Sequence, residues 1–315
     1  MEKRIRVGCY GAKGSYTYEA MERHFGKWER EEIYFSLFED VTKAVAAGII
    51  DYGVVPIENS STGGITEVYD LIRGCGCAVV GEELVKIEHH LLGLPGAEME
   101  DIDTVYSHPQ ALMQCQGWLS QHLPKAERRA VSSNAEGARL AATNPAWAGL
   151  ASERAAAQFG LHIVSHAIQD EAYNRTRFSV ICLPQTLAMP AATARDCTSI
   201  VVSVPNKPGS VHDMLTPLKK HGVSMTRFES RPAKSGKWEY YFYIDLQGHP
   251  SHVKHILGQR IAALGLQPGQ HICQVPDRRA ALVHGRWKAA RMGQHQLAHV
   301  LPRHAHDVGH VGQPN

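Results

Sequence analysis

Short runs of apolar and β-branched residues alternate with segments of helical periodicity along the first 183 residues of the chain. This alternation predicts an α/β domain built on mostly parallel strands. The predicted strands span residues 5–10, 33–37, 52–56, 78–88, 104–107, 148–151 and 178–183. Helices are predicted between them, over residues 15–25, 40–47, 65–73, 110–122, 134–142 and 152–159.

A second domain follows a stretch without usable periodicity. Residues 185–196 combine proline with small side chains, which is typical of a linker. The pattern then predicts strand, helix, strand, strand, helix and strand over residues 199–204, 211–221, 224–230, 239–246, 252–264 and 271–275. This βαββαβ order predicts a ferredoxin-like domain over residues 197–277. Residues 278–315 are basic and rich in histidine, and we expect this tail to be disordered.

The composition narrows the possible functions. The 315 residues include 33 Lys plus Arg against 31 Asp plus Glu, and this net charge of +2 argues against a nucleic-acid-binding protein. The seven cysteines are scattered and form no CxxC pair, so we expect reduced thiols in a cytoplasmic protein. No apolar run approaches the roughly 18 residues of a membrane helix, and the first residues do not form a signal peptide. Motifs of zinc proteases, serine hydrolases and P-loop proteins are absent from the sequence.

Polar residues gather at three predicted junctions between a strand and the next helix. These junctions are residues 11–17, residues 56–64, and residues 107–110 before a helix that carries Gln114. Helix N-termini attract anions, and glycine, hydroxyl and amide groups can orient a ligand without adding charge. Any one junction could simply be a helix cap. Together with a fourth polar segment, residues 174–178, they predict a site for a small anion with more than one carboxylate.

The four segments together resemble those of prephenate dehydratases, which make phenylpyruvate on the route to phenylalanine. The matching stretches are Gly11 to Thr17, Pro56 to Ser60, Ser107 to Gln110 with Gln114 and Cys115, and Thr176 to Phe178. Asn206 to Val211 and Glu229 to Pro232 are similar to the two effector motifs of the ACT domain in that family. The resemblance covers about residues 5–275. It implies an α/β fold with a two-lobed catalytic domain like a periplasmic binding protein, followed by a ferredoxin-like βαββαβ ACT domain.

The resemblance also implies the domain organisation. We expect the catalytic domain over residues 1–184, with lobe 1 at about residues 1–84 and 173–184 and lobe 2 at about residues 85–172. Two positions depart from the family pattern: Ala12 replaces the usual proline, and Ser210 with Val211 replaces the usual Ala-Leu. No chorismate mutase helices precede Ile5, so we expect a monofunctional enzyme.

Site residues follow from the matched motifs. The resemblance implies a catalytic hydroxyl on Thr176, and a carboxylate partner in Arg177. The other catalytic candidates are Asn59, Ser107, Gln114 and Glu58. Further substrate-binding candidates are Ser60, Gly14, Ser15, Tyr16, Thr17, His108, Asn174 and Phe178. The effector-binding candidates are Asn206, Pro208, Gly209, Ser210, Val211, Glu229, Ser230, Arg231 and Pro232.

The activity that the resemblance implies is the decarboxylating dehydration of prephenate to phenylpyruvate, water and CO2. This lyase reaction needs no cofactor and no metal, and the proton donor could be Glu58, His108 or a bound water. We expect control by phenylalanine, a homodimer or homotetramer, and neither nucleic acid nor membrane as a partner. Two alternatives stay open: an arogenate dehydratase, whose substrate has an amine in place of the keto group, and a non-enzymatic sensor of aromatic ligands.

Overall fold

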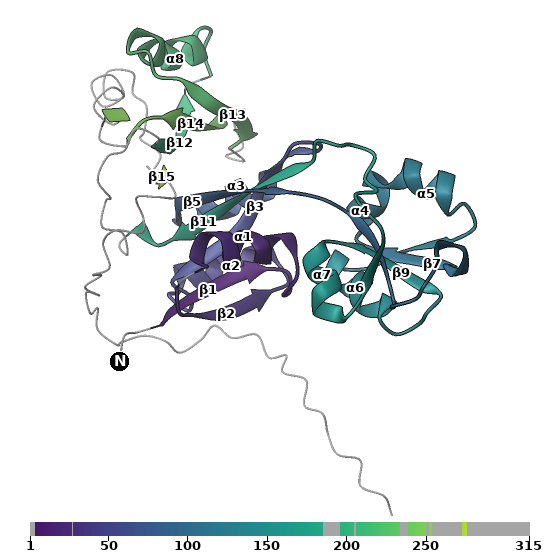
Figure 1. Cartoon of the computed structure of the whole chain (residues 1–315). Helices are drawn as coiled ribbons and strands as arrows, with labels where there is room; N and C mark the ends of the chain where they lie inside the picture. Colours follow the sequence, from purple (N-terminus) through teal and green to yellow (C-terminus); the bar gives the residue numbers. More distant parts are fainter. Residues whose placement is uncertain are drawn as a thin grey trace, which may run out of the picture. The chain divides into compact units, whose positions relative to one another are not determined.

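The computed structural model of the chain (Figure 1) describes residues 4–26, 28–184, 196–204, 206–233, 239–249, 252–253 and, for the backbone, 273–275. Most of the predicted linker, most of the helix predicted at 252–264 and the whole tail at 278–315 lie outside these residues. Among the described residues, no helix is both long and apolar enough to cross a membrane.

The first sheet has six strands in the order β2-β1-β3-β11-β5, with β4 paired to β3. Its strands are β1 (Ile5–Tyr10), β2 (Arg30–Phe35), β3 (Tyr52–Asn59), β4 (Gly63–Gly64), β5 (Ala78–Lys86) and β11 (Arg175–Cys182). The helices of this part of the chain are α1 (Tyr16–Phe25), α2 (Phe38–Ala46) and α3 (Thr66–Gly74). Apolar residues of α1, β1, β5 and β11 form one core cluster, and those of α2, α3 and β3 contribute to a second.

The second sheet has five strands in the order β10-β6-β9-β7-β8. Its strands are β6 (His90–Gly93), β7 (Thr104–Ser107), β8 (Glu127–Ala130), β9 (Trp147–Ala151) and β10 (His162–Ser165). The helices here are η1 (Met99–Asp101), α4 (Pro109–Gln114), α5 (Gln116–His122), α6 (Asn134–Ala141) and α7 (Glu153–Phe159). The sequence pattern does not predict strands β8 and β10. Strand β8 is exposed along its whole length and β10 is only partly buried, so neither has the buried apolar face that produces a recognisable alternation.

The expectation of mostly parallel strands is wrong. Strand β11 runs antiparallel to both of its neighbours, β3 and β5, and β6 runs antiparallel to β9 and β10. The chain leaves the first sheet after β5, builds the second sheet, and returns through β11. An outgoing strand and a returning strand that lie side by side must run in opposite directions.

The helix predicted over residues 110–122 is two helices, α4 and α5, with a break at Cys115. The carboxylate of Asp170 accepts hydrogen bonds from the backbone N–H groups of Gly117 and Trp118, at 2.9 and 3.0 Å. A carboxylate satisfies the free N–H groups at the start of a helix, so a residue far along the chain caps α5.

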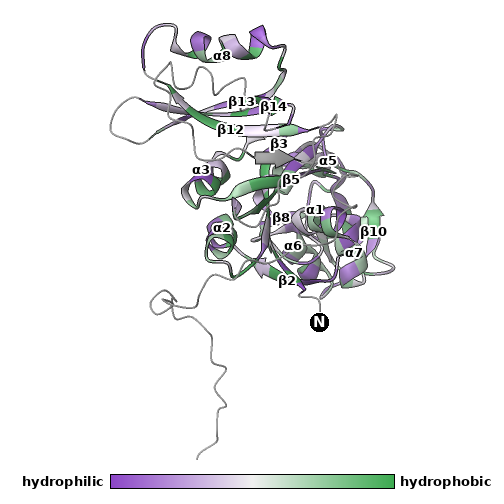
Figure 2. Ribbon diagram, turned by 90° about the vertical axis from the view of Figure 1, so that its left-hand side faces the viewer, coloured by the Kyte–Doolittle hydropathy of each residue, from purple (hydrophilic) through white to green (hydrophobic). Residues whose placement is uncertain are grey.

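The second domain contains an antiparallel sheet in the order β13-β14-β12-β15. Its elements are β12 (Cys197–Val204), α8 (Ser210–Lys220), β13 (Met225–Pro232), β14 (Tyr240–Gln247) and β15 (Cys273–Val275). Figure 2 shows hydrophobic segments along strands such as β5, and hydrophilic turns on α8. The predicted fold class, an α/β protein with a two-lobed domain and a ferredoxin-like domain, is confirmed.

Candidate active site

Strands β3 and β11 bring two of the polar segments side by side. Their register pairs Asn59 with Thr176, and Glu58 with Arg177. Successive residues of a strand point to opposite faces of the sheet, whereas directly paired residues share a face. Asn59 and Thr176 therefore lie on one face, and Glu58 and Arg177 lie on the other.

The side chain of Asn59 is the centre of a buried hydrogen-bond network. Its Nδ2 donates to the hydroxyl of Thr176 at 2.9 Å and to Oδ1 of Asn174 at 2.8 Å. Its Oδ1 accepts from the backbone N–H groups of Ser61 and Thr62, at 3.0 and 3.2 Å. Only 5% of Asn59 and 8% of Thr176 is exposed. A hydroxyl that accepts a hydrogen bond keeps its own hydrogen for donation, so Thr176 is oriented to act as a donor.

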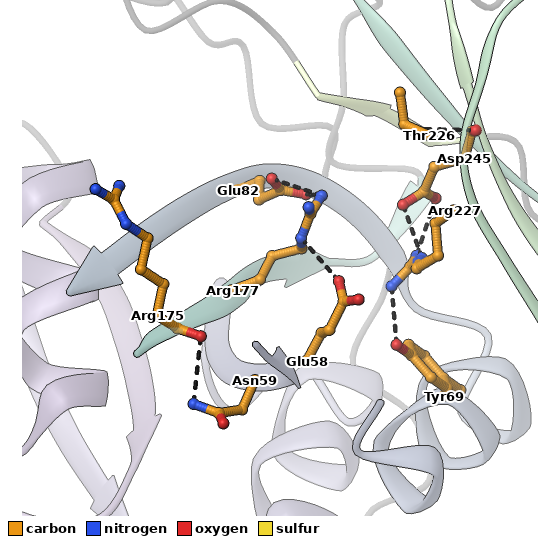
Figure 3. Close-up of polar contacts among 9 residues, drawn as sticks. All are labelled: Glu58, Asn59, Tyr69, Glu82, Arg175, Arg177, Thr226, Arg227 and Asp245. Carbon is orange, nitrogen blue, oxygen red and sulfur yellow. Dashed lines mark hydrogen bonds and ion pairs between the residues drawn. The ribbon is translucent and has the colours of Figure 1, made fainter. Parts of the chain in front are cut away.

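Ser60 ties the loop after β3 to the chain just before β11. Its hydroxyl donates to the carbonyl of Tyr173 at 3.2 Å and accepts from the N–H of Arg175 at 2.9 Å. Asn59 also donates to the carbonyl of Arg175, while the side chain of Arg175 points away from Asn59 (Figure 3). These bonds hold Ser60 and Asn174 beside Thr176.

Arg177 and Glu58 belong to an ion-pair cluster on the other face of the sheet (Figure 3). The guanidinium lies 3.1 Å from Glu58 through Nε and 3.0 Å from Glu82 through Nη1. Burial raises the pKa of Glu82, and the positive charge of Arg177 acts against that rise. The predicted roles of Arg177 as a carboxylate partner and of Glu58 as a catalytic group stay predictions. In the structure their charges pair with each other on the face opposite Thr176.

Loops from the two sheets of the first domain contact each other at this site. Nε2 of Gln110, in α4, donates to the hydroxyl of Thr62 at 3.4 Å, and that hydroxyl lies 3.4 Å from Oδ1 of Asn59. The hydroxyl of Ser152 donates to the carbonyl of Gly14 at 3.1 Å. The polar segment at residues 11–17 thus contacts the chain at the start of α7. The segment at residues 56–64 contacts the segment at residues 107–110.

His89, which the sequence analysis did not select, joins Tyr16 to Gln114. Its Nε2 lies 2.9 Å from Oε1 of Gln114, and its Nδ1 lies 3.3 Å from the hydroxyl of Tyr16. The tyrosine hydroxyl also donates to the carbonyl of Glu88. The only sequence signal was the position of His89 just beyond a predicted strand, where binding residues of α/β folds tend to lie.

Three predicted site residues are packed in the interior. The hydroxyl of Ser107 lies 2.7 Å from the carbonyl oxygen of Leu150 and 2.9 Å from Oδ1 of Asn134. Thr17 is also buried, and Phe178 belongs to the hydrophobic core beside β11. The catalytic role of Ser107 and the substrate-binding roles of Thr17 and Phe178 stay predictions, and all three side chains are buried, as are Asn59 and Thr176.

Two further candidates act as helix caps. The hydroxyl of Ser15 accepts from the N–H of Tyr18 at 3.2 Å at the start of α1. Nδ1 of His108 accepts from the N–H of Gln110 at 3.3 Å at the start of α4. Burial lowers the pKa of His108, which favours the neutral ring.

In the second domain, the two effector segments lie at the same end of the sheet. Val204 pairs with Tyr240, and Tyr240 pairs with Pro232, so one strand, or about 10 Å, separates the two segments. Gly209 has a φ of +83°, which glycine adopts most readily, and it precedes the first turn of α8. The segment after β12 includes Asn206, Pro208, Ser210 and Val211, and the segment in β13 includes Glu229 and Ser230.

The side chain of Arg231, another effector-binding candidate, contacts helix α3. Its Nη2 donates to Oδ2 of Asp70 in α3 at 2.8 Å. The predicted role of this guanidinium in effector binding stays a prediction, and in the structure it pairs with a carboxylate of the first domain.

Comparison with known proteins assigns both domains. A family model for prephenate dehydratase matches residues 7–186, and a model for the ACT domain matches residues 198–252. A bifunctional chorismate mutase/prephenate dehydratase of Neisseria gonorrhoeae is 41% identical over 251 residues, which are 79% of this chain and 68% of that protein.

Solved structures show the same similarity. The prephenate dehydratase of Arthrobacter aurescens in complex with L-Phe has a TM-score of 0.75 and 28% identity, over 88% of this chain and 91% of that one. The prephenate dehydratase of Staphylococcus aureus has a TM-score of 0.71 and 25% identity, over 85% of this chain and 100% of that one. The chain therefore belongs to the prephenate dehydratase family and carries an ACT domain.

Proposed function

We propose that the protein converts prephenate to phenylpyruvate, water and CO2, and that Thr176 is the donor that assists the departing hydroxyl group. The observation that carries this proposal is the 2.9 Å hydrogen bond from Asn59 to Thr176. Because Thr176 accepts that bond, its own hydrogen is free for the leaving oxygen. Both side chains are buried, and a donor fixed in a buried site stabilises developing charge more strongly than one in water.

The reaction itself defines what the site must do. The bond between the ring and its carboxylate breaks and CO2 leaves, and the electron pair passes through the ring. The C–O bond across the ring breaks, and the hydroxide that leaves takes up a proton to become water. Aromatisation supplies the driving force. The protein must therefore hold a dianion in one orientation and polarise one C–O bond.

Neutral donors are proposed to hold the dianion. Gln110 contacts the Asn59 network through Thr62, and Gln114 follows in the same helix. The N-terminus of α1, which begins at Tyr16, adds a partial positive charge. A bound water is the proposed proton source, because Arg177 engages Glu58 and burial keeps His108 neutral.

A valine at position 176 tests this function, since it removes the hydroxyl and keeps the shape. We expect Thr176→Val to lower kcat about 100-fold or more, measured by the absorbance of phenylpyruvate formed from prephenate. Ser179→Ala is the matched control, because this hydroxyl on the same strand is buried and has no hydrogen-bond partner among the described residues. Near-normal turnover by Thr176→Val would exclude Thr176 from the mechanism.

The same assay separates the alternatives. Faster turnover of arogenate than of prephenate by the wild-type protein would identify an arogenate dehydratase. Folded protein that binds prephenate but converts neither substrate would be a sensor of aromatic ligands.

Regulation and assembly are part of the proposal. We infer that phenylalanine binds the ACT domain, since the Arthrobacter aurescens relative was solved with L-Phe and Gly209 allows close approach of backbone N–H groups.

We place the protein in the cytoplasm, because the described cysteines are free thiols. A homodimer or homotetramer is favoured because β13 is an edge strand that exposes Met225 and Phe228. Light scattering with and without phenylalanine tests the assembly.

A further inference from the structure

His89 lies between the two sheets of the catalytic domain, in the segment that connects β5 with β6. Only 2% of this residue is exposed. Its backbone is fixed on both sides, because its N–H donates to Oε1 of Gln169 at 3.0 Å and its carbonyl accepts from the N–H of Ile168 at 2.8 Å. The fold therefore holds the backbone of His89 between the two sheets.

The ring contacts one predicted site residue from each side. Tyr16 belongs to α1, which packs on the first sheet, and Gln114 ends α4, which belongs to the second. Nε2 lies 2.9 Å from Oε1 of Gln114, and Nδ1 lies 3.3 Å from the hydroxyl of Tyr16. The Tyr16 and His89 rings meet edge to face, with 5.8 Å between their centroids. His89 is thus the direct link between these two side chains.

The contact to Gln114 has a chemical consequence. A carbonyl oxygen can only accept, so Nε2 of His89 carries the hydrogen and Nδ1 carries none. The one hydrogen of the Tyr16 hydroxyl goes to the carbonyl of Glu88, and Nδ1 lies 3.3 Å from the hydroxyl oxygen. Burial lowers the pKa of His89 to about 4, so the ring stays neutral near pH 7 and keeps this division of donor and acceptor. With its carbonyl end held, Gln114 retains both amide N–H groups as donors. Gln114 is partly exposed, so a ligand can reach these donors.

We propose that His89 is a positioning residue that holds the carbonyl of Gln114, so that the amide N–H groups of Gln114 point to a carboxylate or the leaving oxygen of the bound substrate. This inference rests on the proposed dehydratase function. It assigns His89 no contact with the substrate and no proton transfer, because Nε2 faces Gln114 and Nδ1 faces the hydroxyl of Tyr16.

A double-mutant cycle on kcat/KM tests the inference. His89→Leu and Gln114→Leu should each lower kcat/KM by about 10- to 100-fold. The double variant should be no worse than the more impaired single variant, because His89 acts through Gln114. Losses that multiply in the double variant, or wild-type activity in His89→Leu, would overturn the inference.

Two conservative variants keep the test valid if His89→Leu does not fold. Glutamine at position 89 can place an amide N–H near the Nε2 position, whereas asparagine reaches only as far as the Nδ1 position. We therefore expect His89→Gln to retain at least tenfold more kcat/KM than His89→Asn, with circular dichroism as the check on folding. Equal activities of two folded variants would contradict the role. Absence of prephenate turnover by the wild type would instead reject the proposed function.

Discussion

At the scale of single residues, Glu58 and Asn59 are neighbours in one motif, but their side chains point to opposite faces of the sheet. The motif alone offers a carboxylate and an amide as neighbouring candidates. In the structure, Asn59 donates to Thr176 at 2.9 Å, whereas Glu58 meets Arg177 at 3.1 Å on the other face. In the proposed mechanism the neutral pair keeps a hydroxyl hydrogen for the ligand, whereas the charged pair belongs to an ion-pair cluster with Glu82.

His89 makes the stability of the protein depend on pH. Burial lowers its pKa from 6.5 to about 4. Between these two values the unfolded chain takes up a proton at this residue, while the folded protein keeps the ring neutral. The free energy of unfolding therefore falls as the pH is lowered through this window, by about 3 kcal/mol from this residue.

The variant His89→Gln has no titrating ring, so its free energy of unfolding should fall less between about pH 7 and pH 4 than that of the wild type. Urea unfolding followed by circular dichroism measures the difference. His212→Gln is the control, because the side chain of His212 is 83% exposed, and this variant should keep the wild-type slope. The same slope in His89→Gln and wild type would contradict the neutral buried ring.

At the scale of elements, α6 lies directly against β7 and β9. A Cβ on Gly137 would stand 2.5 Å from the carbonyl oxygen of Tyr106 and 3.1 Å from Cα of Ser107. This close approach brings Asn134, the first residue of α6, to the hydroxyl of Ser107 and the N–H of His108. The contact between helix and strand therefore shapes the loop that leads into α4.

Gly137→Ala should lower the free energy of unfolding by about 2 kcal/mol, because the backbone of β7 must move to admit the methyl group. This loss opposes the gain of roughly 1 kcal/mol that alanine offers inside a helix. Gly74→Ala, at the end of α3, is the matched control, since its Cβ would meet nothing within 4 Å. Denaturation midpoints compare the two variants, and equal stabilities would argue against the close packing of α6.

At the scale of the whole molecule, polar side chains of the ACT sheet contact helix α3 of the catalytic domain. Asp70 accepts from Nη2 of Arg231 at 2.8 Å and from the hydroxyl of Tyr243 at 3.2 Å. Arg227 donates to the hydroxyl of Tyr69 at 3.1 Å and is paired with Asp245 (Figure 3). These contacts give an effector on the ACT domain a physical connection to the catalytic domain.

Asp70→Ala should raise the phenylalanine concentration needed for half-maximal regulation by at least fivefold, while kcat without phenylalanine changes less than twofold. The expected size follows from the coupling free energies of 1–3 kcal/mol, or about 5- to 150-fold, that are typical of allosteric proteins. Turnover of prephenate over a phenylalanine titration measures both values. Asp213→Ala, on the exposed surface of α8, serves as the control. Unchanged regulation in Asp70→Ala would show that the coupling takes another route.

The family and the fold class could be read from the chain alone, and so could the polar motifs that we expect to form the site. Alternation of apolar positions and the order of short motifs are local properties, so they can be read along the chain. Asn59, Thr176 and Gly209 belong to such motifs, and the βαββαβ order identified the ferredoxin-like domain.

Which side chains of those segments lie together on one face of the sheet became visible only in the folded chain. The antiparallel return of β11 paired Arg177 with Glu58 and Glu82, and packing placed the hydroxyl of Ser107 between Leu150 and Asn134. The cap that Asp170 places on α5 and the link that His89 makes between Tyr16 and Gln114 each join residues far apart in the sequence. Such contacts depend on register and packing across the whole domain, which no local pattern along the chain records.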